Sequence, residues 1–386
     1  MLILSKFLKC LYEQMCKGLG VRMKKLIYYA GIMIIVILLL PMLIVKSCGK
    51  MPEKVKAPQR QEKLEQSEEI IKKEKPEKVK VQEKAENKEY IISVYDNNLK
   101  RSEEMDLEEY IKGVVAAEMP AEFHPEALKA QAIAARTYAY GRFSGVYESK
   151  TGVHDGIDVC KDSTHCQAWI SREAAIKKWN VFFASKYWSK IAKAVDSTKG
   201  LIVVYDGKVA NTLFHSSSSE RTENSEDVWP GVSVPYLRSV TSTGDEEAKG
   251  FEVSTNIKSS EIIEKLKEAY PNEEFHGDLY DSINVLEYTA GGRVKTLKIG
   301  DITLKGTEFR TLLGLRSTNF VVEKVGKGTG DKQMLRITTR GYGHGVGMSQ
   351  YGADSLAKKG GTCMEILKHY YTGVDVIPIS DYEHSN

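Results

Sequence analysis

The stretch Gly341-Tyr-Gly-His-Gly-Val-Gly-Met-Ser-Gln-Tyr-Gly-Ala353 is the most distinctive part of this sequence, because every second residue from Gly341 to Gly347 is glycine. Glycine permits backbone conformations with positive φ and lets another segment or a ligand come close, at a cost in chain entropy. A tight turn between two strands is the simplest interpretation. A phosphate loop is excluded because no Gly-Lys-Ser/Thr follows, and the alternation does not fit a dinucleotide-binding fingerprint. By its own chemistry, the run shows only that His344 is presented on a bare backbone.

Helices and strands alternate irregularly before and after this run. A helix is predicted over Leu107–Met119, where Pro120 ends it, and another over His124–Phe143, where Pro125 suits the first turn. Further predictions are a strand over 90–95, a hairpin of 201–205 and 209–215, a helix within 251–270 capped by Thr255, strands within 283–304, a helix over 307–313 that Gly314 ends, and a closing helix over 362–371. Without a regular βαβ alternation, the sequence predicts an α+β fold with mostly antiparallel strands.

The first 88 of the 386 residues differ in composition from the rest. Residues 26–45 are almost wholly apolar, and about 20 such residues span a bilayer as a helix. Several lysines precede this segment, so we expect residues 1–25 in the cytoplasm, a single-pass transmembrane anchor over 26–45 and a charged extracytoplasmic linker over 46–88. A cleaved signal peptide is the alternative, although its apolar core is usually only about 7–15 residues. Met23 could also be the true start.

One globular domain is expected over 89–378, with a short C-terminal tail over 379–386. The formal net charge of +3 gives no overall attraction to nucleic acid, so none is expected as a partner.

Two cysteines and two histidines lie close together between His154 and Cys166, and they form the best candidate metal site. Two thiolates and two imidazoles can complete a tetrahedral zinc site. Cys160, Cys166 and His154 are the first ligands expected, with His165 or a water as the fourth. A Cys160–Cys166 disulfide outside the cytoplasm, or two ordinary thiols, are the alternatives.

Glu118 is the candidate catalytic carboxyl, because it ends an apolar helix just before Pro120. Apolar neighbours in a cleft raise the pKa of a carboxyl, which is the state that a general acid needs. A glutamate in an ordinary polar contact is the plainer interpretation.

Polar side chains elsewhere could bind a substrate. Arg136 offers a planar, forked donor for hydroxyls or a carboxylate, or else forms a structural salt bridge. The segment from Phe214 to Trp229 combines hydroxyls, an amide and an aromatic ring, as carbohydrate sites do, and alone it could be only a polar loop. The substrate-binding residues predicted are Arg136, Gln167, Ser216, Ser218 and His344.

Several of these motifs, in this order, resemble the stage II sporulation protein D family of endospore-forming bacteria. The matching stretches are Ala117-Glu-Met-Pro120, Ala135-Arg-Thr-Tyr138, the serine-rich segment from Ser216 to Ser225, and Gly341–Ala353. Ser219-Glu220 stands where the family has Gly-Gly, so the geometry of that loop is expected to differ from that of the family.

The resemblance implies a membrane-anchored lytic transglycosylase that cuts peptidoglycan glycan strands, preferably strands without stem peptides, during forespore engulfment. It implies a two-lobed domain with a long substrate groove, Glu118 as the essential acid with Glu122 as its rival, and stage II sporulation proteins P and M as partners. Zinc would be structural, because some relatives lack the cysteines. Two rival functions remain open: a wall-binding activator of an amidase, and a zinc hydrolase.

Overall fold

The computed structural model describes residues 88–147, 156–275, 278–326 and 333–385. The chain divides into two units, Met1–Gln82 and Glu83–Asn386, and all the described residues belong to the second. These residues form a mixed α+β domain with small, mostly antiparallel sheets, as predicted. Buried apolar side chains gather in two separate hydrophobic cores. Among the described helices, none is both long and apolar enough to cross a bilayer, and the predicted anchor over 26–45 lies outside them.

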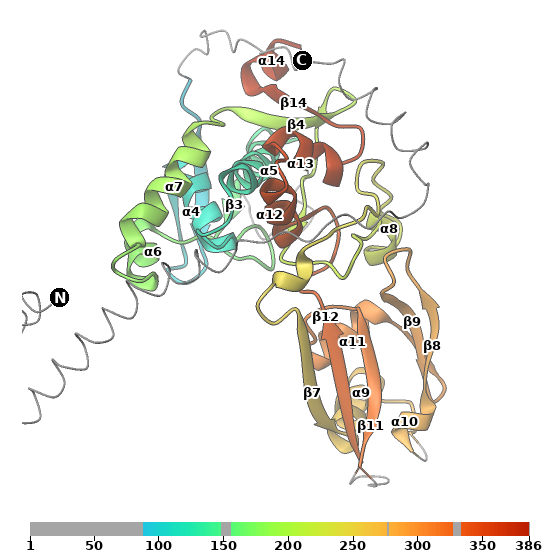
Figure 1. Cartoon of the computed structure of the whole chain (residues 1–386). Helices are drawn as coiled ribbons and strands as arrows, with labels where there is room; N and C mark the ends of the chain where they lie inside the picture. The colour runs from blue at the N-terminus through green and yellow to red at the C-terminus, as the bar shows by residue number, and fades with distance from the viewer. Residues whose placement is uncertain (1–87, 148–155, 276–277, 327–332, 386) are drawn as a thin grey trace, which may run out of the picture. The chain divides into compact units, whose positions relative to one another are not determined.

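The first core surrounds helix α5 (Pro125–Phe143), whose run of alanines is fully buried. Small side chains let neighbouring helices approach closely, so α5 contacts four others: α4 (Leu107–Glu118), α7 (Ala184–Asp196), α12 (Gln350–Lys358) and α13 (Cys363–Tyr370) (Figure 1). Pro125 occupies the first turn of α5, and Glu126 N–H donates to the His124 ring, as the predicted helix start requires.

Short sheets and helices complete this first half of the fold. One sheet has the order β2-β1-β3, and a second has the order β14-β4-β5. The bounds are β1 (Ile91–Asp96), β2 (Arg101–Asp106), β3 (Val159–Cys160), α6 (Arg172–Lys178), β4 (Leu201–Tyr205), β5 (Lys208–Val209), β14 (Asp375–Pro378) and α14 (Ile379–Ser385). The predicted C-terminal tail over 379–386 thus contains a helix, α14, whose Ile379 is buried.

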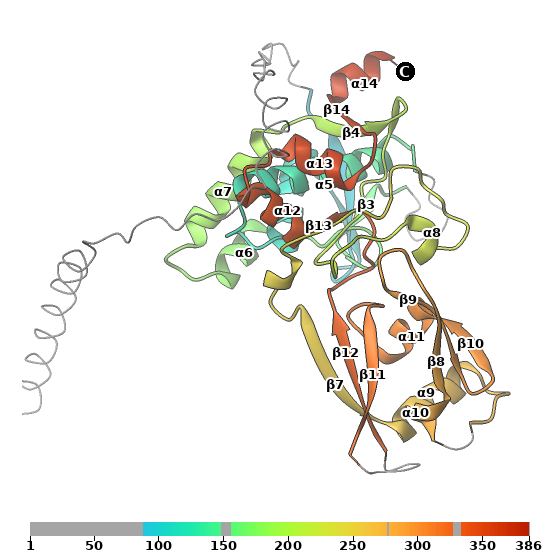
Figure 2. The same cartoon turned by 45° about the vertical axis from the view of Figure 1, so that its right-hand side comes forward.

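The second core lies between two antiparallel three-stranded sheets and their helices (Figure 2). The sheet orders are β10-β9-β8 and β11-β12-β7. The bounds are β7 (Glu252–Lys258), α9 (Ser259–Ala269), α10 (Leu279–Ser282), β8 (Ile283–Tyr288), β9 (Val294–Ile299), β10 (Ile302–Lys305), α11 (Gly306–Leu313), β11 (Phe320–Val325) and β12 (Met334–Arg340). Gly314 ends α11 in a left-handed conformation with a φ of 63°, as predicted.

Two predicted elements are wrong. Thr255 does not cap a helix, because it lies within β7, where it pairs with Ile337 of β12, and α9 begins only at Ser259. The predicted strand over 209–215 is broken: β5 ends at Val209, and β6 (Phe214–His215) pairs in parallel with β13 (Met348–Ser349). Two short helices, α8 (Ser225–Val228) and the 3-10 turn Asp245–Glu247, follow β6 along the chain. The pairing of β6 with β13 brings the serine-rich segment beside the glycine run.

Candidate functional site

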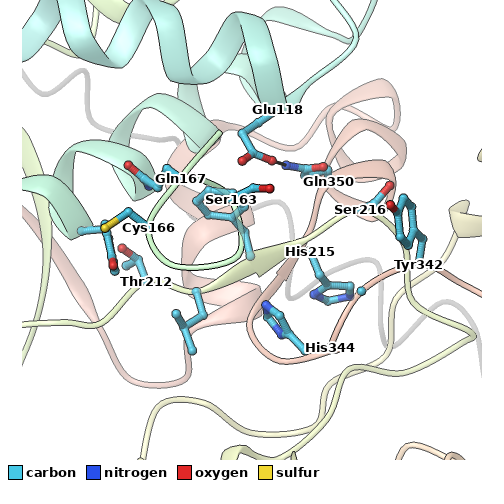
Figure 3. A pocket seen from close by; sticks show the side chains of 14 residues that line it. Glu118, Ser163, Cys166, Gln167, Thr212, His215, Ser216, Tyr342, His344 and Gln350 are labelled. Atoms are coloured by element: carbon cyan, nitrogen blue, oxygen red, sulfur yellow. Dashed lines mark hydrogen bonds between the residues drawn. The ribbon is translucent and has the colours of Figure 1, made fainter. Parts of the chain in front are cut away.

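Glu118 is the last residue of α4, which ends there because Met119 is extended and Pro120 follows. Its side chain is half-buried and points into a pocket (Figure 3). Oε1 accepts a hydrogen bond from the Ala168 backbone N–H at 2.9 Å, and Oε2 accepts one from Gln350 Nε2 at 3.2 Å. Burial raises the pKa of Glu118, and the two hydrogen bonds oppose this only in part. A carboxyl with a raised pKa is suited to donate a proton near neutral pH.

The pocket has a volume of about 370 Å³ and is built from segments far apart in the sequence. Its lining residues are Glu118, Tyr138, Ser163, Cys166, Gln167, Thr212, Leu213, Phe214, His215, Ser216, Tyr342, Gly343, His344 and Gln350. Glu118 carries the one carboxyl group among these described lining residues. Four of the predicted residues therefore meet around one cavity: Glu118, Gln167, Ser216 and His344. Glu122, the rival carboxyl, is exposed and does not line the pocket.

Gln167 is buried to 2 % exposure, and neither its amide nitrogen nor its amide oxygen has a hydrogen-bond partner among the described residues. Burying an unsatisfied amide is costly unless a partner arrives. Gln167 lines the same pocket as Glu118. A polar molecule bound in this pocket could therefore form the missing hydrogen bonds with the Gln167 amide.

The glycine run is not a simple turn between two strands. Gly341, Gly343, Gly345 and Gly347 all have positive φ. At Gly347 a Cβ atom would lie 2.0 Å from the Leu213 carbonyl oxygen, so only glycine fits there. Single bridges join Tyr342 to Ser217 and Val346 to Glu223, so the run lies along the serine-rich segment. This close approach brings His344 into the pocket.

Both histidines of the site are held neutral. The Val346 carbonyl accepts from His215 Nδ1 at 3.2 Å, so His215 Nε2 accepts from the Ser218 hydroxyl at 2.6 Å. His344 Nδ1 accepts from the Val346 N–H at 3.1 Å. Burial, followed by the charge of Arg293, lowers the pKa of His344 to about 4. Burial also lowers the pKa of His215, so neither ring is a proton donor near neutral pH.

Ser218 is corrected from a substrate-binding residue to a structural one. It is fully buried and does not line the pocket. Its hydroxyl donates to His215, and its backbone N–H donates to Asp245 Oδ1 at 2.7 Å. The hydroxyl is therefore used in holding His215, and the backbone N–H is used in binding Asp245.

Arg136 is corrected in the same way. Its side chain is fully buried, and its Nε and Nη2 donate to the two carboxylate oxygens of Glu108 at 2.8 and 2.6 Å. The remaining donors reach the carbonyls of Leu201 and Val195. Arg136 thus joins α4, α5, α7 and β4 as an internal salt bridge, away from the pocket.

Glu220 occupies the loop position where the stage II sporulation protein D family, which this sequence resembles, usually has glycine. It has a φ of 114°, a conformation that favours glycine. A side chain at this φ carries a cost in backbone strain.

Cys160, His165 and Cys166 form a cluster whose ligand atoms all lie within 4.8 Å of one another. His165 Nδ1 lies 3.8 Å from Cys160 Sγ and 3.5 Å from Cys166 Sγ. No disulfide joins these two cysteines in the described part of the chain, in contrast to the alternative prediction. The hydrogen bond from Cys160 lowers the pKa of Cys166 to about 4. Two sulfurs and an imidazole at this spacing fit zinc. His165, expected only as a possible fourth ligand, belongs to the cluster, and His154, one of the three first-expected ligands, lies outside the described residues.

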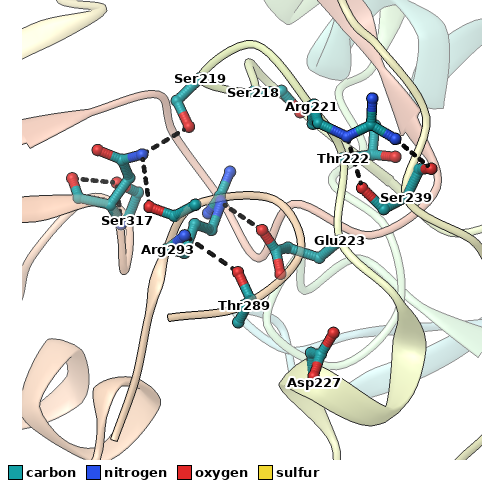
Figure 4. Close-up of polar contacts among 12 residues, drawn as sticks. Ser218, Ser219, Arg221, Thr222, Glu223, Asp227, Ser239, Thr289, Arg293 and Ser317 are labelled. Atoms are coloured by element: carbon teal, nitrogen blue, oxygen red, sulfur yellow. Dashed lines mark hydrogen bonds and ion pairs between the residues drawn. The ribbon is translucent and has the colours of Figure 1, made fainter. Parts of the chain in front are cut away.

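A buried ion pair supports the glycine run, and the sequence analysis missed it. Glu223 and Arg293 are both essentially unexposed, with 3.6 Å between Glu223 Oε1 and Arg293 Nε (Figure 4). Arg293 Nη1 also donates to the Gly343 carbonyl at 3.0 Å. Burial raises the pKa of Glu223 to about 7, and it lowers the pKa of Arg293 to about 10. The pair therefore ties the loop after β8 to the backbone that presents His344.

Known proteins have sequences similar to this chain. Residues 95–205 match the family described as stage II sporulation protein, and residues 243–347 match a domain of unknown function. The stage II sporulation protein D of Bacillus amyloliquefaciens is 38% identical over 285 residues, covering 74% of this chain and 78% of the relative. The Bacillus subtilis protein of the same name is 37% identical over 288 residues, with the same two shares. A Bacillus subtilis amidase enhancer is 30% identical over 311 residues, covering 68% of this chain and 39% of that protein.

These matches define a class, the bacterial stage II sporulation proteins. Within that class, the chain belongs to the stage II sporulation protein D family.

Proposed function

We propose that this protein is a lytic transglycosylase that cleaves the bond between N-acetylmuramic acid and N-acetylglucosamine in peptidoglycan glycan strands. The observation that carries the proposal is Glu118, which has a raised pKa and is the one carboxyl group among the described residues of the pocket. Glycosidases that use water normally need two carboxyl groups, whereas a transglycosylase can use one.

In the proposed mechanism, Glu118 first protonates the glycosidic oxygen that leaves. The ionised carboxylate then takes the proton from the muramyl 6-hydroxyl as that oxygen closes onto the anomeric carbon. The product ends in 1,6-anhydromuramic acid, and no water is consumed. The Ala168 N–H and the Gln350 amide hold the carboxylate in place through both steps. The imidazoles of His215 and His344 are neutral, so neither donates a proton as an acid. Glu118 is therefore the group that transfers the proton.

The other pocket residues would bind the sugars. The unsatisfied amide of Gln167 offers both a donor and an acceptor to sugar hydroxyls or an acetamido group. Ser216 adds a hydroxyl, and Tyr342, which is 45% exposed, offers a flat face to a sugar ring. A long groove beyond this pocket stays a prediction.

Zinc would be held by Cys160, His165 and Cys166, and His154, expected from the sequence as a ligand, would complete the set. When bound, it would supply structural cross-linking of the loop 160–167 rather than catalysis. That loop leads directly into Gln167 and Ala168, the residues that face and hold Glu118. An ordered loop would therefore keep the acid in position.

We propose that residues 26–45 anchor the chain in the membrane, with the domain outside the cytoplasm, acting on septal peptidoglycan during forespore engulfment. Glycan strands lacking stem peptides are the proposed substrate, and stage II sporulation proteins P and M are the proposed partners.

Glu118→Gln tests the proposal, because it keeps the shape of the side chain and removes its proton. Denuded glycan strands incubated with this variant should show a loss of cleavage of at least about 10³-fold, since the only acid and base are gone. Glu122→Gln is the matched control and should retain the wild-type rate. Undiminished cleavage by Glu118→Gln would contradict the assignment of Glu118 as the catalytic acid and base.

A second candidate function is activation of an amidase without glycan cleavage. The similarity to a protein named amidase enhancer favours it. Mass spectrometry separates the two: anhydro ends appear only if this chain cuts glycan, whereas faster release of stem peptides by an added amidase, without anhydro ends, supports the activator.

A further inference from the structure

The turn between α6 and α7 exposes three consecutive apolar side chains. Val181 is 81% exposed, Phe182 86% and Phe183 48%. Large apolar residues grouped on the surface usually mark a contact with a partner or a membrane. Both views place α6 and α7 at an edge of the domain, away from the sheet of β7, β11 and β12 (Figure 1 and Figure 2).

Lysines continue from this turn along one face of α7. Lys186, Lys190 and Lys193 recur at helical spacing on the side opposite the buried Ile191 and Val195. They line a cavity of about 490 Å³ together with Lys129, near the start of α5. Lys190 Nζ donates to the Glu122 carbonyl at 3.0 Å and also to the Phe123 carbonyl, which holds its ammonium at the cavity.

The region of α6 and α7 is strongly basic. Residues 172–199 contain seven basic and two acidic side chains, while the whole chain has a net charge of only +3. None of the salt bridges among the described residues uses Lys177, Lys178, Lys186 or Lys193, so these charges are available to a ligand. Trp179, Tyr187 and Trp188 lie half-buried beside the apolar turn. Aromatic rings combined with lysines are typical of segments that lie in a membrane interface.

We propose that this surface, formed by Val181–Phe183 and the lysine face of α7, docks on an anionic phospholipid bilayer. The three apolar side chains insert among the acyl chains, and the lysines contact headgroup phosphates. Charge complementarity favours this occupant, and so does the apolar segment 26–45, which would bring the domain to a bilayer. The inference goes beyond glycan cleavage and does not depend on it. Docking would fix the orientation of the pocket relative to the membrane, which a tether alone does not do.

Hydrogen exchange of the full chain in lipid nanodiscs tests this proposal. Peptides covering residues 179–193 should exchange at least about five-fold more slowly in discs containing phosphatidylglycerol than in phosphatidylcholine discs, since each docked lysine strengthens binding by about that factor. Phe182→Ser should abolish the difference. Val321→Ser, on exposed β11, is the matched control and should keep it.

Two results would overturn the proposal. One is equal exchange of residues 179–193 in the two kinds of disc. The other is protection that appears in phosphatidylcholine discs and increases with protein concentration, because it would mean that a second copy of the chain covers this surface. Since Phe182 is almost fully exposed, its replacement leaves both hydrophobic cores intact, and glycan cleavage in detergent should be unchanged.

Discussion

Glu223→Gln isolates the ionisation of the buried carboxyl that faces Arg293. Glu223 is unexposed, and burial raises its pKa from 4.5 to about 7 although the Arg293 charge acts in the opposite direction. The folded protein therefore binds this proton more tightly than the unfolded chain does. The stability that the proton provides is complete below a pH of about 4.5, and it is lost as the pH rises through about 7.

The size of the effect follows from the two pKa values. The difference between 4.5 and about 7 corresponds to about 3 kcal/mol, most of which falls between about pH 5 and about pH 8. Glutamine does not ionise, so the free energy of unfolding of the wild type, relative to Glu223→Gln, should fall by about 2–3 kcal/mol over this range. His215 and His344 have the opposite effect: because their pKa values are lowered in the folded protein, they reduce stability at low pH. This effect is present in both the wild type and Glu223→Gln, so it cancels in the comparison.

Urea unfolding of the two proteins in one detergent, over a series of pH values, measures this difference directly. Glu264→Gln, an exposed substitution on α9, is the matched control and should track the wild type at every pH. A difference between the wild type and Glu223→Gln that stays constant from about pH 5 to about pH 8 would refute the reasoning.

Three further predictions concern the metal site and the buried contacts. Cys160→Ser should reduce the zinc content of the purified chain to a small fraction of the wild-type value, measured by atomic emission, and full retention would exclude this site. Arg136→Met should lower the free energy of unfolding by about 3–5 kcal/mol, because it leaves Glu108 buried without its partner, and urea unfolding showing less than about 1 kcal/mol would contradict this. Gly345→Ala should lower the melting temperature, because its Cβ would lie 2.7 Å from the Arg293 guanidinium at a φ of 88°, and an unchanged melting curve would contradict the packing.

Local signals allowed part of the fold to be predicted. Pro125 and the alanine run define α5, and Gly314 ends α11, because caps and helix propensities act within a few residues. Thr255 shows where such signals fail: it is a good cap by type, but β7 pairs along its whole length with β12, some eighty residues later. Pairing over that separation leaves no local mark in the sequence.

The site could be predicted where motifs supplied the residues, and less well where burial decides their role. Glu118, Gln167, Ser216 and His344 do line one pocket. The prediction that Arg136 binds substrate is wrong, because a guanidinium can bind an internal carboxylate as well as a substrate. Only the packing of the folded chain decides between the two. The pairing of Glu223 with Arg293 could not be seen, because two distant loops create it.

Glycan cleavage in H2¹⁸O tests most directly whether Glu118 works as a single acid and base. Denuded strands are digested with the wild type and with Glu118→Gln, and the new ends are examined by mass spectrometry. The proposed mechanism predicts 1,6-anhydro ends without ¹⁸O from the wild type and no new ends from Glu118→Gln. Reducing ends that carry ¹⁸O, or anhydro ends that persist in Glu118→Gln, would contradict it.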